Sequence, residues 1–305
     1  MDKCIVVKGN RAFCVPVRDV KKNDQIIVGE DGVKITPPER PREGVNVFEF
    51  MGSSSSSERP TQHIAKQVAD DIFNTKKKGG KIIIVGGSRG IGNSLLTTLV
   101  ENHKIINISR VQPSLSHVNL SHYTCDILID ELPDITDVDS IIYCPGSINL
   151  KPISRLKLDD FRNDFEINVI GAVKTIQKYL PILKKGNKPS VVLFSTVATA
   201  LGMPYHASVA AAKSAVEGLV KSLGAELAPT IRINAIAPTV TDTDLASKLL
   251  RNDKMIDMIT ERHPLKKFLD PKEVADMAEF LLSPKSSSIS GQVFKMDCGI
   301  VSFKI

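Results

Sequence analysis

The chain has 305 residues, enough for one large domain or for one large and one small domain. Hydrophobic residues make up 42% and charged residues 24%, a balance typical of a folded globular protein, which excludes a mostly disordered chain. The net charge is +6, but the lysines are dispersed, so we expect no nucleic-acid partner. No apolar run approaches the roughly 18 residues of a membrane span, and the N-terminus is not typical of a signal peptide. We therefore expect a cytoplasmic protein with no membrane contact.

Five cysteines are spread along the chain, an odd number with no Cys-x-x-Cys pair. This pattern argues against a disulfide framework and against a zinc knuckle, so we expect reduced thiols and no metal site. His117 and His122 have the closest metal-like spacing, but no further ligands cluster near them, and we interpret both as surface residues. The cysteines are Cys4, Cys14, Cys125, Cys144 and Cys298.

Residues 1–58 are predicted to form a small β-rich module, because short β-branched runs alternate there with turn residues. Two hairpins or a small barrel fit this pattern. A proline-rich segment, 37–42, predicts a stiff extended chain, and the serine run Ser53–Ser57 predicts a mobile loop. Apolar residues at helical spacing predict a helix at Thr61–Lys77, within a linker at 59–80. The predicted strands are Ile5–Val7, Ala12–Val17, Gln25–Val28 and Val33–Thr36.

Strands and helices alternate over residues 81–305, which favours a doubly wound parallel sheet of the Rossmann type, in the α/β fold class. The predicted strands are Lys81–Val85, Lys104–Ile108, Ser140–Tyr143, Ser190–Phe194, Ile231–Ile236 and Gly291–Met296. The predicted helices are Asn93–Glu101, Leu158–Leu180, Ser208–Leu227 and Pro271–Leu282.

A glycine-rich turn, Gly86–Gly92, joins the first of these strands to the first helix. Glycine lets backbone N–H groups approach a phosphate and permits a positive φ, and the helix N-terminus adds positive potential. Because a strand precedes the turn and a helix follows it, we expect this turn to bind the phosphates of a dinucleotide.

The spacing of Gly86, Gly90 and Gly92 resembles the Thr-Gly-x-x-x-Gly-Ile-Gly motif of the short-chain dehydrogenase/reductase family, with Val85 in place of the threonine. The resemblance covers residues 81–299. It includes Asp126, which matches an acid that meets adenine. Further matching stretches are Cys144-Pro145-Gly146 (where the family has Asn-Ala-Gly), Asn168–Gly171, Ala212–Gly218, Arg232–Pro238, Ser290–Gln292 and Asp297–Gly299.

The charge near the expected ribose predicts the choice of cofactor. The second strand ends in Ser109-Arg110, with no acid to read a 2′-hydroxyl, and Arg89 lies inside the glycine-rich turn. Two arginines can clasp a 2′-phosphate, so we expect NADP(H) rather than NAD(H); the alternative is two surface arginines. The cofactor-binding residues that the resemblance and this argument imply are Gly86, Ser88, Arg89, Gly90, Ile91, Gly92, Ser109, Arg110, Asp126, Ile127, Cys144, Pro145, Gly146, Lys213, Pro238, Val240, Thr241 and Thr243.

The resemblance implies a catalytic tetrad of Asn, Ser, Tyr and Lys. Asn168 and Lys213 match two members, and the serine position falls on Thr196, with Ser195 beside it as a second candidate hydroxyl. The tyrosine position, four residues before Lys213, is Val209. Valine cannot donate a proton, so the family's usual mechanism cannot run unchanged.

Two side chains upstream are candidates to replace that tyrosine. His206 lies seven residues before Lys213, close to two helical turns, in the register of the Tyr-x6-Lys pattern of the superfamily's enoyl reductases. Tyr205 lies one residue further upstream. Histidine can serve as an acid near neutral pH. The alternative is that both are loop residues at the rim of the pocket in a chain that has lost activity.

The segment Pro238–Thr243 resembles the family's Pro-Gly-x-x-x-Thr loop, with Thr239 in place of glycine, and is implied to contact the nicotinamide amide and the pyrophosphate. Asp244–His263 then takes the place of a substrate lid, either as an amphipathic helix over an apolar pocket or as a plain packing face. Family members usually form dimers or tetramers through the helices that correspond to Leu158–Leu180 and Ser208–Leu227. We therefore expect a homodimer or a homotetramer.

The stretch Val33–Pro60 resembles a small β module found beside ornithine-cyclodeaminase-type domains of archaeal and cyanobacterial arginine metabolism. A plain β appendage that mediates assembly or covers the active site is the other interpretation. Three functions follow as expectations. The first is an NADP(H)-dependent oxidoreductase acting on a small-molecule carbonyl, alcohol or enoyl substrate. The second is a catalytically inactive NADP(H)-binding sensor or scaffold, and the third is an enzyme of amino-acid metabolism in which both regions act together.

Overall fold

The computed structural model describes residues 3–8, 11–16, 25–29, 32–36 and 80–304. The chain divides into two compact units, residues 1–77 and 78–305, and each is treated by itself. The predicted extended segment 37–42, the predicted loop Ser53–Ser57 and the predicted helix Thr61–Lys77 lie outside the described residues.

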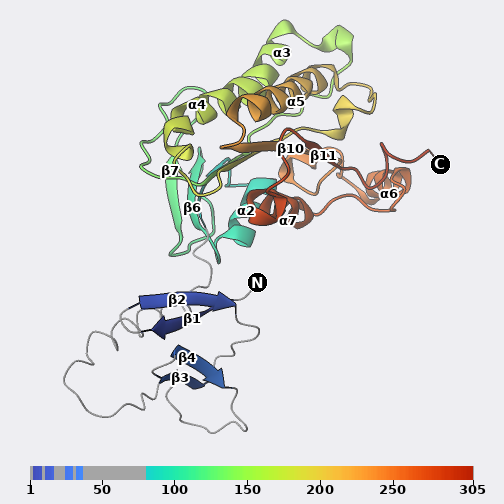
Figure 1. Cartoon of the computed structure of the whole chain (residues 1–305). Coiled ribbons are helices and arrows are strands. Elements are labelled where there is room, and N and C mark those ends of the chain that lie inside the picture. Colours follow the sequence, from blue (N-terminus) through green and yellow to red (C-terminus); the bar gives the residue numbers. More distant parts are fainter. Residues whose placement is uncertain (1–2, 9–10, 17–24, 30–31, 37–79, 305) are drawn as a thin grey trace. The chain divides into compact units, whose positions relative to one another are not determined.

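The first unit contains two antiparallel hairpins (Figure 1). Strand β1 (Lys3–Lys8) pairs with β2 (Arg11–Pro16), and β3 (Gln25–Gly29) pairs with β4 (Gly32–Thr36). Each pair forms its own two-stranded sheet. These strands lie where β-branched runs and turn residues predict them.

The second unit is built on one sheet of seven parallel strands, in the order β11-β10-β9-β8-β5-β6-β7. The chain starts in the middle of the sheet, builds outward to β7, and then crosses back to build the other half, which is the doubly wound arrangement. The strands are β5 (Lys81–Val85), β6 (Lys104–Ser109), β7 (Leu120–Thr124), β8 (Ser140–Tyr143), β9 (Ser190–Phe194), β10 (Arg232–Pro238) and β11 (Val293–Met296).

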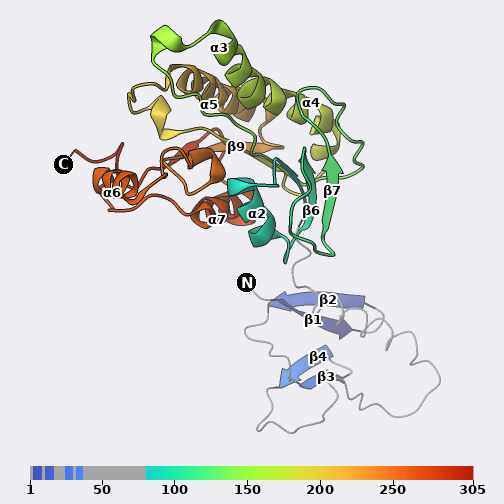
Figure 2. The ribbon, with the colours of Figure 1, turned by 180° about the vertical axis from the view of Figure 1, so that it is seen from behind.

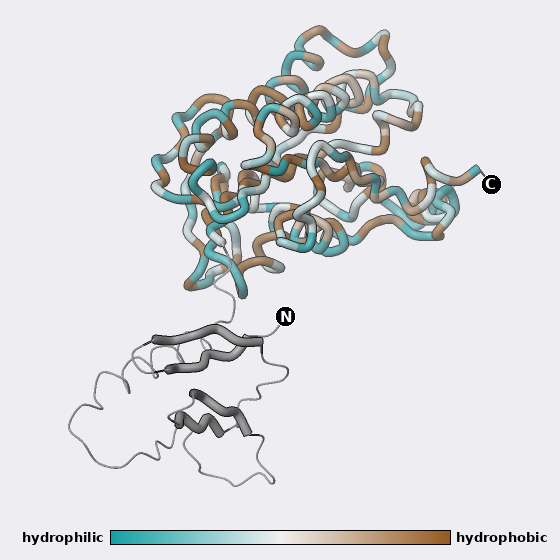
Figure 3. Tube along the Cα trace, in the orientation of Figure 1, coloured by the Kyte–Doolittle hydropathy of each residue, from teal (hydrophilic) through white to brown (hydrophobic). Residues whose placement is uncertain are grey.

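Helices cover both faces of this sheet, as the two opposite views in Figures 1 and 2 show. On one face lie α3 (Leu158–Phe165), α4 (Gly171–Leu183) and α5 (Ala207–Leu227), and on the other lie α2 (Gly90–Leu99) and α7 (Pro271–Leu282). Each face buries its own apolar cluster, and the central strands β5, β8 and β9 between them are hydrophobic along most of their length (Figure 3). The predicted α/β fold class is confirmed. A further helix, α6 (Asp253–Arg262), follows β10.

Beyond small shifts in bounds, the structure differs from the predicted elements in two places. The edge strand β7 is not predicted, because its residues are mostly exposed and carry no apolar run. The single predicted helix at Leu158–Leu180 is two helices, α3 and α4, joined by a π-helical turn at Glu166–Ile170. Within the expected lid, α6 has no fully buried residue, whereas Met255, Ile256 and Ile259 are partly buried, and both interpretations of this segment stay predictions.

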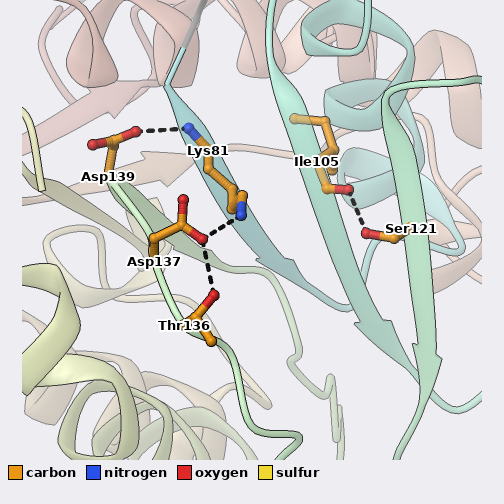
Figure 4. Close-up of polar contacts among 6 residues, drawn as sticks. All are labelled: Lys81, Ile105, Ser121, Thr136, Asp137 and Asp139. Carbon is orange, nitrogen blue, oxygen red and sulfur yellow. Dashed lines mark hydrogen bonds and ion pairs between the residues drawn. The ribbon is translucent and has the colours of Figure 1, made fainter.

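The edge of the sheet where the strands begin is held by aspartates (Figure 4). Asp139 accepts the backbone N–H of Lys81 at 2.8 Å and the backbone N–H of Asn187 at 2.6 Å, so one carboxylate joins the start of β5 to the loop before β9. Asp137 pairs with the Lys81 ammonium and accepts from Thr136 at 3.2 Å. These contacts lie at the amino ends of the strands. In open α/β sheets, ligands bind at the opposite, carboxyl ends of the strands. Among the described residues, no helix is both long enough and apolar enough to span a membrane.

Candidate functional site

The glycine-rich loop after β5 adopts a conformation that side chains would block. Gly86 and Gly90 have φ values of +80° and +52°, in the region that favours glycine. A Cβ on Gly92 would lie 2.1 Å from the carbonyl oxygen of Gly86. Helix α2 begins at Gly90, so its free N–H groups open toward this loop. The loop is therefore shaped to bring backbone donors close to a phosphate group.

The residues predicted to meet the ribose and adenine come from the glycine-rich turn after β5, from the end of β6 and from the segment after β7. Arg89 is exposed, and the guanidinium of Arg110, also exposed, lies 3.9 Å from the carboxylate of Asp126. Asp126 accepts the backbone N–H of Leu128 at 3.0 Å, and Ile127 beside it is buried. Ser109 does not offer a free hydroxyl, because its Oγ is buried and donates to the Val111 carbonyl at 2.8 Å.

The loop after β8 contacts the glycine-rich loop and also lies beside Lys213. A Cβ on Gly86 would lie 3.1 Å from Pro145, so the two loops are in close contact. A Cβ on Gly146 would lie 3.1 Å from Oδ1 of Asn168 and 3.4 Å from Nζ of Lys213. The structure therefore brings Gly146, Asn168 and Lys213 together, although they come from three separate stretches of the sequence.

Lys213 is buried on α5, and its ammonium donates to the carbonyl of Phe194 at 2.8 Å. Burial lowers the pKa of Lys213 from its ordinary value of 10.5 to about 8, because water no longer solvates the charge. The neighbouring Cys144 and Asp164 act in the opposite direction on this pKa. Burial also raises the pKa of the Cys144 thiol, which keeps it protonated.

Asn168 lies in the π-helical turn between α3 and α4 and is buried. Its side-chain amide donates to the backbone carbonyl of Asp164 at 2.7 Å and to Ser147 Oγ at 3.3 Å. Its Oδ1 has no partner among the described residues. A π-helical turn frequently marks a functional site, and here it turns an amide toward the lysine. Sequence reasoning found Asn168 but missed Asp164 and Ser147, which hold it.

The two candidate hydroxyls after β9 have different surroundings. Ser195 is buried, and its Oγ donates to the Glu217 carboxylate, which also accepts from Thr199 at 2.7 Å. Thr196 is only partly buried, and its Oγ1 has one weak contact, with the N–H of Ala198 at 3.3 Å. The Thr196 hydroxyl is therefore the more available of the two. Glu217 is a second supporting residue that sequence reasoning missed.

The segment before α5 carries the two candidates to replace the missing tyrosine, Tyr205 and His206. Tyr205 has a φ of +69° and a side chain 57% exposed, and His206 precedes the first residue of α5. One ring nitrogen of His206, Nδ1, lies 2.8 Å from the Pro204 carbonyl. Val209 is buried, four residues before Lys213. Tyr205 and His206 both stay predictions as the group that meets a substrate.

The loop after β10 approaches the glycine-rich loop. A Cβ on Gly90 would lie 3.1 Å from the Thr243 methyl group, and Thr243 Oγ1 donates to the Thr241 carbonyl at 3.3 Å. Thr239, where glycine was expected, is buried, and its Oγ1 lies 2.8 Å from Nε2 of His263, which follows α6. A groove of about 610 Å³ opens beside these residues, between the starts of α2 and α7. Pro238 and Val240 complete the predicted loop.

The site as a whole is a phosphate-binding loop next to a buried lysine, an amide and a hydroxyl, at the ends of β5, β8 and β9. Nowhere in the described ranges do three His, Cys, Asp or Glu side chains gather to hold a metal ion. Two features fit a bound dinucleotide. The glycine-rich loop leaves a space that a Cβ would fill, and the side-chain oxygen of Asn168 has no partner among the described residues.

Comparison with known protein families divides the chain into the same two parts. Residues 125–301, more than half of the chain, match the family model described as enoyl-(acyl carrier protein) reductase. Residues 1–65 match the model described as arginine dihydrolase ArgZ-like, C-terminal, first region.

Individual relatives follow the same division. The chain is 49% identical over 87 residues to an ornithine cyclodeaminase of Archaeoglobus fulgidus, covering 28% of this chain and 21% of that protein. It thus spans about a fifth of the length of the first curated relatives that it matches. It is 26% identical over 249 residues to 2,5-dichloro-2,5-cyclohexadiene-1,4-diol dehydrogenase of Sphingobium indicum, covering 73% of this chain and 98% of that protein. The solved structure of ElxO with NADP bound is similar with a TM-score of 0.67 and 25% identity, covering 74% of this chain and 100% of that one.

Proposed function

The chain belongs to the short-chain dehydrogenase/reductase family, and from this premise we propose that it is an NADP(H)-dependent oxidoreductase. Its substrate is a small molecule with a carbonyl or alcohol group, or an enoyl group, to or from which hydride passes. The observation that carries the proposal is the buried Lys213 ammonium, which lies beside Gly146 and Asn168. A buried cation at the end of a Rossmann-type sheet is costly to keep, and a bound anionic dinucleotide gives it a role.

When bound, NADPH would donate hydride to a carbonyl or enoyl substrate, and NADP+ would accept hydride from an alcohol. The backbone N–H groups of Gly86–Gly92 bind its diphosphate, and the exposed Arg89 and Arg110 bind the 2′-phosphate through charge-assisted hydrogen bonds. Thr241 and Thr243 border the diphosphate from the loop after β10. The similarity to a structure that contains NADP supports this assignment.

Lys213, Asn168 and Thr196 act on the reacting end of the molecule. The Lys213 ammonium binds ribose hydroxyls and supplies positive potential near the substrate oxygen. The Thr196 hydroxyl donates to that oxygen and orients it. Val209 stands where the family has its tyrosine, so the proton that neutralises the oxygen comes from Tyr205 or His206.

The first test is a titration with NADPH, followed by the emission of the cofactor, because the chain has no Trp. NADH is titrated in parallel. Arg89→Ala should weaken NADPH binding and leave NADH binding unchanged, since only NADPH carries the 2′-phosphate. Arg162→Ala is the matched control, because Arg162 is an exposed arginine on α3 paired with Asp159. Equal losses for both cofactors, or binding of neither, would contradict the proposal.

A catalytically inactive NADP(H)-binding sensor or scaffold is the second candidate, and Val209 favours it. Turnover with a panel of carbonyl and enoyl compounds separates the two. Lys213→Ala should abolish any turnover of an enzyme. Val209→Tyr should raise the rate if the pocket is otherwise intact. A chain that binds NADPH but turns over nothing, with or without the restored tyrosine, supports the sensor.

The match of residues 1–65 favours a third candidate, an enzyme of amino-acid metabolism in which both units act together. Its substrate would then carry a carbonyl or imine derived from an amino acid. A panel that includes 2-oxo acids and cyclic imines tests this. Rates confined to the other carbonyl compounds would leave the first unit as an appendage.

We extend the proposal to assembly and location. A homodimer or homotetramer through α3, α4 and α5 would cover Leu158, Phe165 and Ile170, which are exposed and apolar. Light scattering coupled to gel filtration measures this, and aspartate at Phe165 should dissociate the assembly. The cysteines of the second unit, Cys125, Cys144 and Cys298, are all free thiols, which favours a reducing, cytoplasmic compartment.

A further inference from the structure

A carboxylate is buried beside the proposed active site, and within the described part of the chain no cation lies within 4.0 Å of it. Asp164, in the last turn of α3, is fully buried. Its Oδ1 accepts from the Ser147 hydroxyl and from the Asn149 amide, the latter at 2.9 Å. Its Oδ2 has no partner among the described residues. Most carboxylates on amphipathic helices face water, so a buried one on α3 calls for a physical reason.

The groups around Asp164 belong to the site already described. Asn168 donates to the Asp164 backbone carbonyl, and Ser147 and Asn149 follow Gly146 in the loop after β8. Helix α3 packs against α5, which carries Lys213 and Ser208. Ser208 Oγ is buried and, like Asn168 Oδ1, has no partner within the described part of the chain. Three unpartnered oxygens thus lie on α5, which carries the buried Lys213, and on the segments that pack against it.

The ionisable groups that act on the Lys213 charge come from two neighbouring elements. The groups that act on the Lys213 charge are the Cys144 thiol at the end of β8 and the Asp164 carboxylate on α3. On α5 itself, Glu217 is occupied by Ser195 and Thr199, and His206 lies before the first turn. The Cys144 thiol stays protonated because its pKa is raised. Asp164 is therefore the carboxylate that can compensate Lys213, and a buried charge without compensation is strongly destabilising.

We propose that Asp164 is a positioning residue: its carboxylate is the counter-charge that keeps Lys213 an ammonium, and through Ser147 and Asn149 it fixes the loop after β8 beside Asn168. This inference rests on the proposed function, because a charged Lys213 matters there for binding the cofactor. It assigns a role to three residues outside the motifs of the sequence. Ser147 and Asn149 donate hydrogen bonds to Oδ1 of Asp164 and do not neutralise its charge. The negative charge of the carboxylate can therefore still act on Lys213.

The test compares two variants that separate charge from hydrogen bonding. D164N keeps the shape of the side chain and removes its charge, whereas S147A keeps the charge and removes one hydrogen bond. NADPH affinity is measured across the pH range for both and for the wild type. In D164N, the pH at which affinity falls on the alkaline side should move down by about one unit, since an opposite charge nearby holds an ammonium protonated. In S147A, the alkaline fall in NADPH affinity should occur at the same pH as in the wild type, even if the affinity itself changes. An unmoved alkaline fall in D164N would overturn the proposal.

A second measurement is independent of the cofactor, so it separates this inference from the proposed function. K213M leaves the Asp164 carboxylate without its counter-charge, which is costly in a buried site. K213M should therefore have a lower thermal midpoint than K213R, which keeps the charge. The D164N/K213M double variant should lose less than the sum of the two single losses. A thermal midpoint of K213M at or above that of K213R would contradict the pairing, even if D164N does not fold. Failure to bind NADPH, with these stability results intact, would count against the proposed function alone.

Discussion

The side-chain oxygen of Asn107 accepts the backbone N–H of Gly87 at 3.0 Å, which ties the glycine-rich loop to the centre of β6. Asn107 is fully buried, and its amide nitrogen donates to Ser109 Oγ at 2.9 Å and lies 3.0 Å from Nδ1 of His122 on β7. A Cβ on Gly87 would lie 2.5 Å from the Asn107 oxygen. The shape of the proposed phosphate site therefore depends on a residue outside the glycine motif.

Replacing Asn107 with leucine should weaken NADPH binding about tenfold, because the Gly87 N–H loses its partner and the loop can relax. The titration of cofactor emission measures this. Asn119→Ala is the matched control, since the Asn119 amide also holds backbone, the Val100 carbonyl at 3.0 Å. The control should lower the thermal midpoint and leave the affinity unchanged. An Asn107 variant with wild-type affinity would show that the tie is dispensable.

Replacing Gly92 with alanine should reduce NADPH binding by roughly 100-fold, because the new Cβ must displace the Gly86 carbonyl from 2.1 Å. Gly218 on α5 offers a comparison, since a Cβ there meets nothing within 4 Å. Gly218→Ala should raise stability by about 0.5–1 kcal/mol through the helix propensity of alanine. Calorimetric titration of both variants measures the contrast. Equal affinities would mean that the loop does not contact the cofactor.

The hydroxyls of Ser195 and Thr196, after β9, should have different roles: one supports stability and the other supports turnover. Thr196→Val removes the available hydroxyl at nearly constant volume, so turnover should fall roughly 100-fold with little change in the thermal midpoint. Ser195→Ala removes a hydrogen bond to Glu217, so stability should fall by about 1 kcal/mol with turnover largely kept. Steady-state rates and thermal unfolding of both variants decide between them. The reverse pattern would assign the substrate contact to Ser195.

Stability and cofactor affinity should respond to alkaline pH in opposite directions. The folded protein holds the pKa of Lys213 at about 8, below its ordinary 10.5, so between these values the unfolded chain binds more protons. The free energy of unfolding therefore gains up to about 3 kcal/mol as the pH rises through this window. NADPH affinity should fall over the same window, because the ammonium loses its charge. The measured quantity is the difference between wild type and Lys213→Met, which cancels the other groups that titrate. A difference in the free energy of unfolding that does not change with pH would contradict a buried Lys213 that titrates in this window.

The central strands could be predicted from the sequence because they are buried on both faces. Lys81–Val85, Ser140–Tyr143 and Ser190–Phe194 have the predicted bounds, since continuous β-branched runs occur where both faces of a parallel strand are covered. Strand β7 carries a mixed sequence, because its side chains are largely exposed at the edge of the sheet. Its place is determined by pairing with β6, which no local pattern reveals.

The candidate site could be predicted where its chemistry follows a motif, and not where it depends on contacts distant in sequence. Gly86, Asn168 and Lys213 lie at positions that the family pattern marks, and the structure brings Asn168 and Lys213 to the same loop. Asp164 and Asn107 belong to no motif. A carboxylate on a predicted amphipathic helix, or an amide in a strand, resembles a solvated residue until the packing of neighbouring elements is known.

The π-helical turn at Glu166–Ile170 has a consequence for how this segment tolerates change in length. The Gly171 N–H bonds to the Glu166 carbonyl, five residues back, so the turn holds one residue more than a regular α-helical turn. A deletion of one residue within it would allow α3 and α4 to merge into one continuous α-helix. That shorter chain could keep its fold while rotating Asn168 about a quarter-turn away from Lys213. The segment is thus a point at which a single lost codon could disable the site without unfolding the protein.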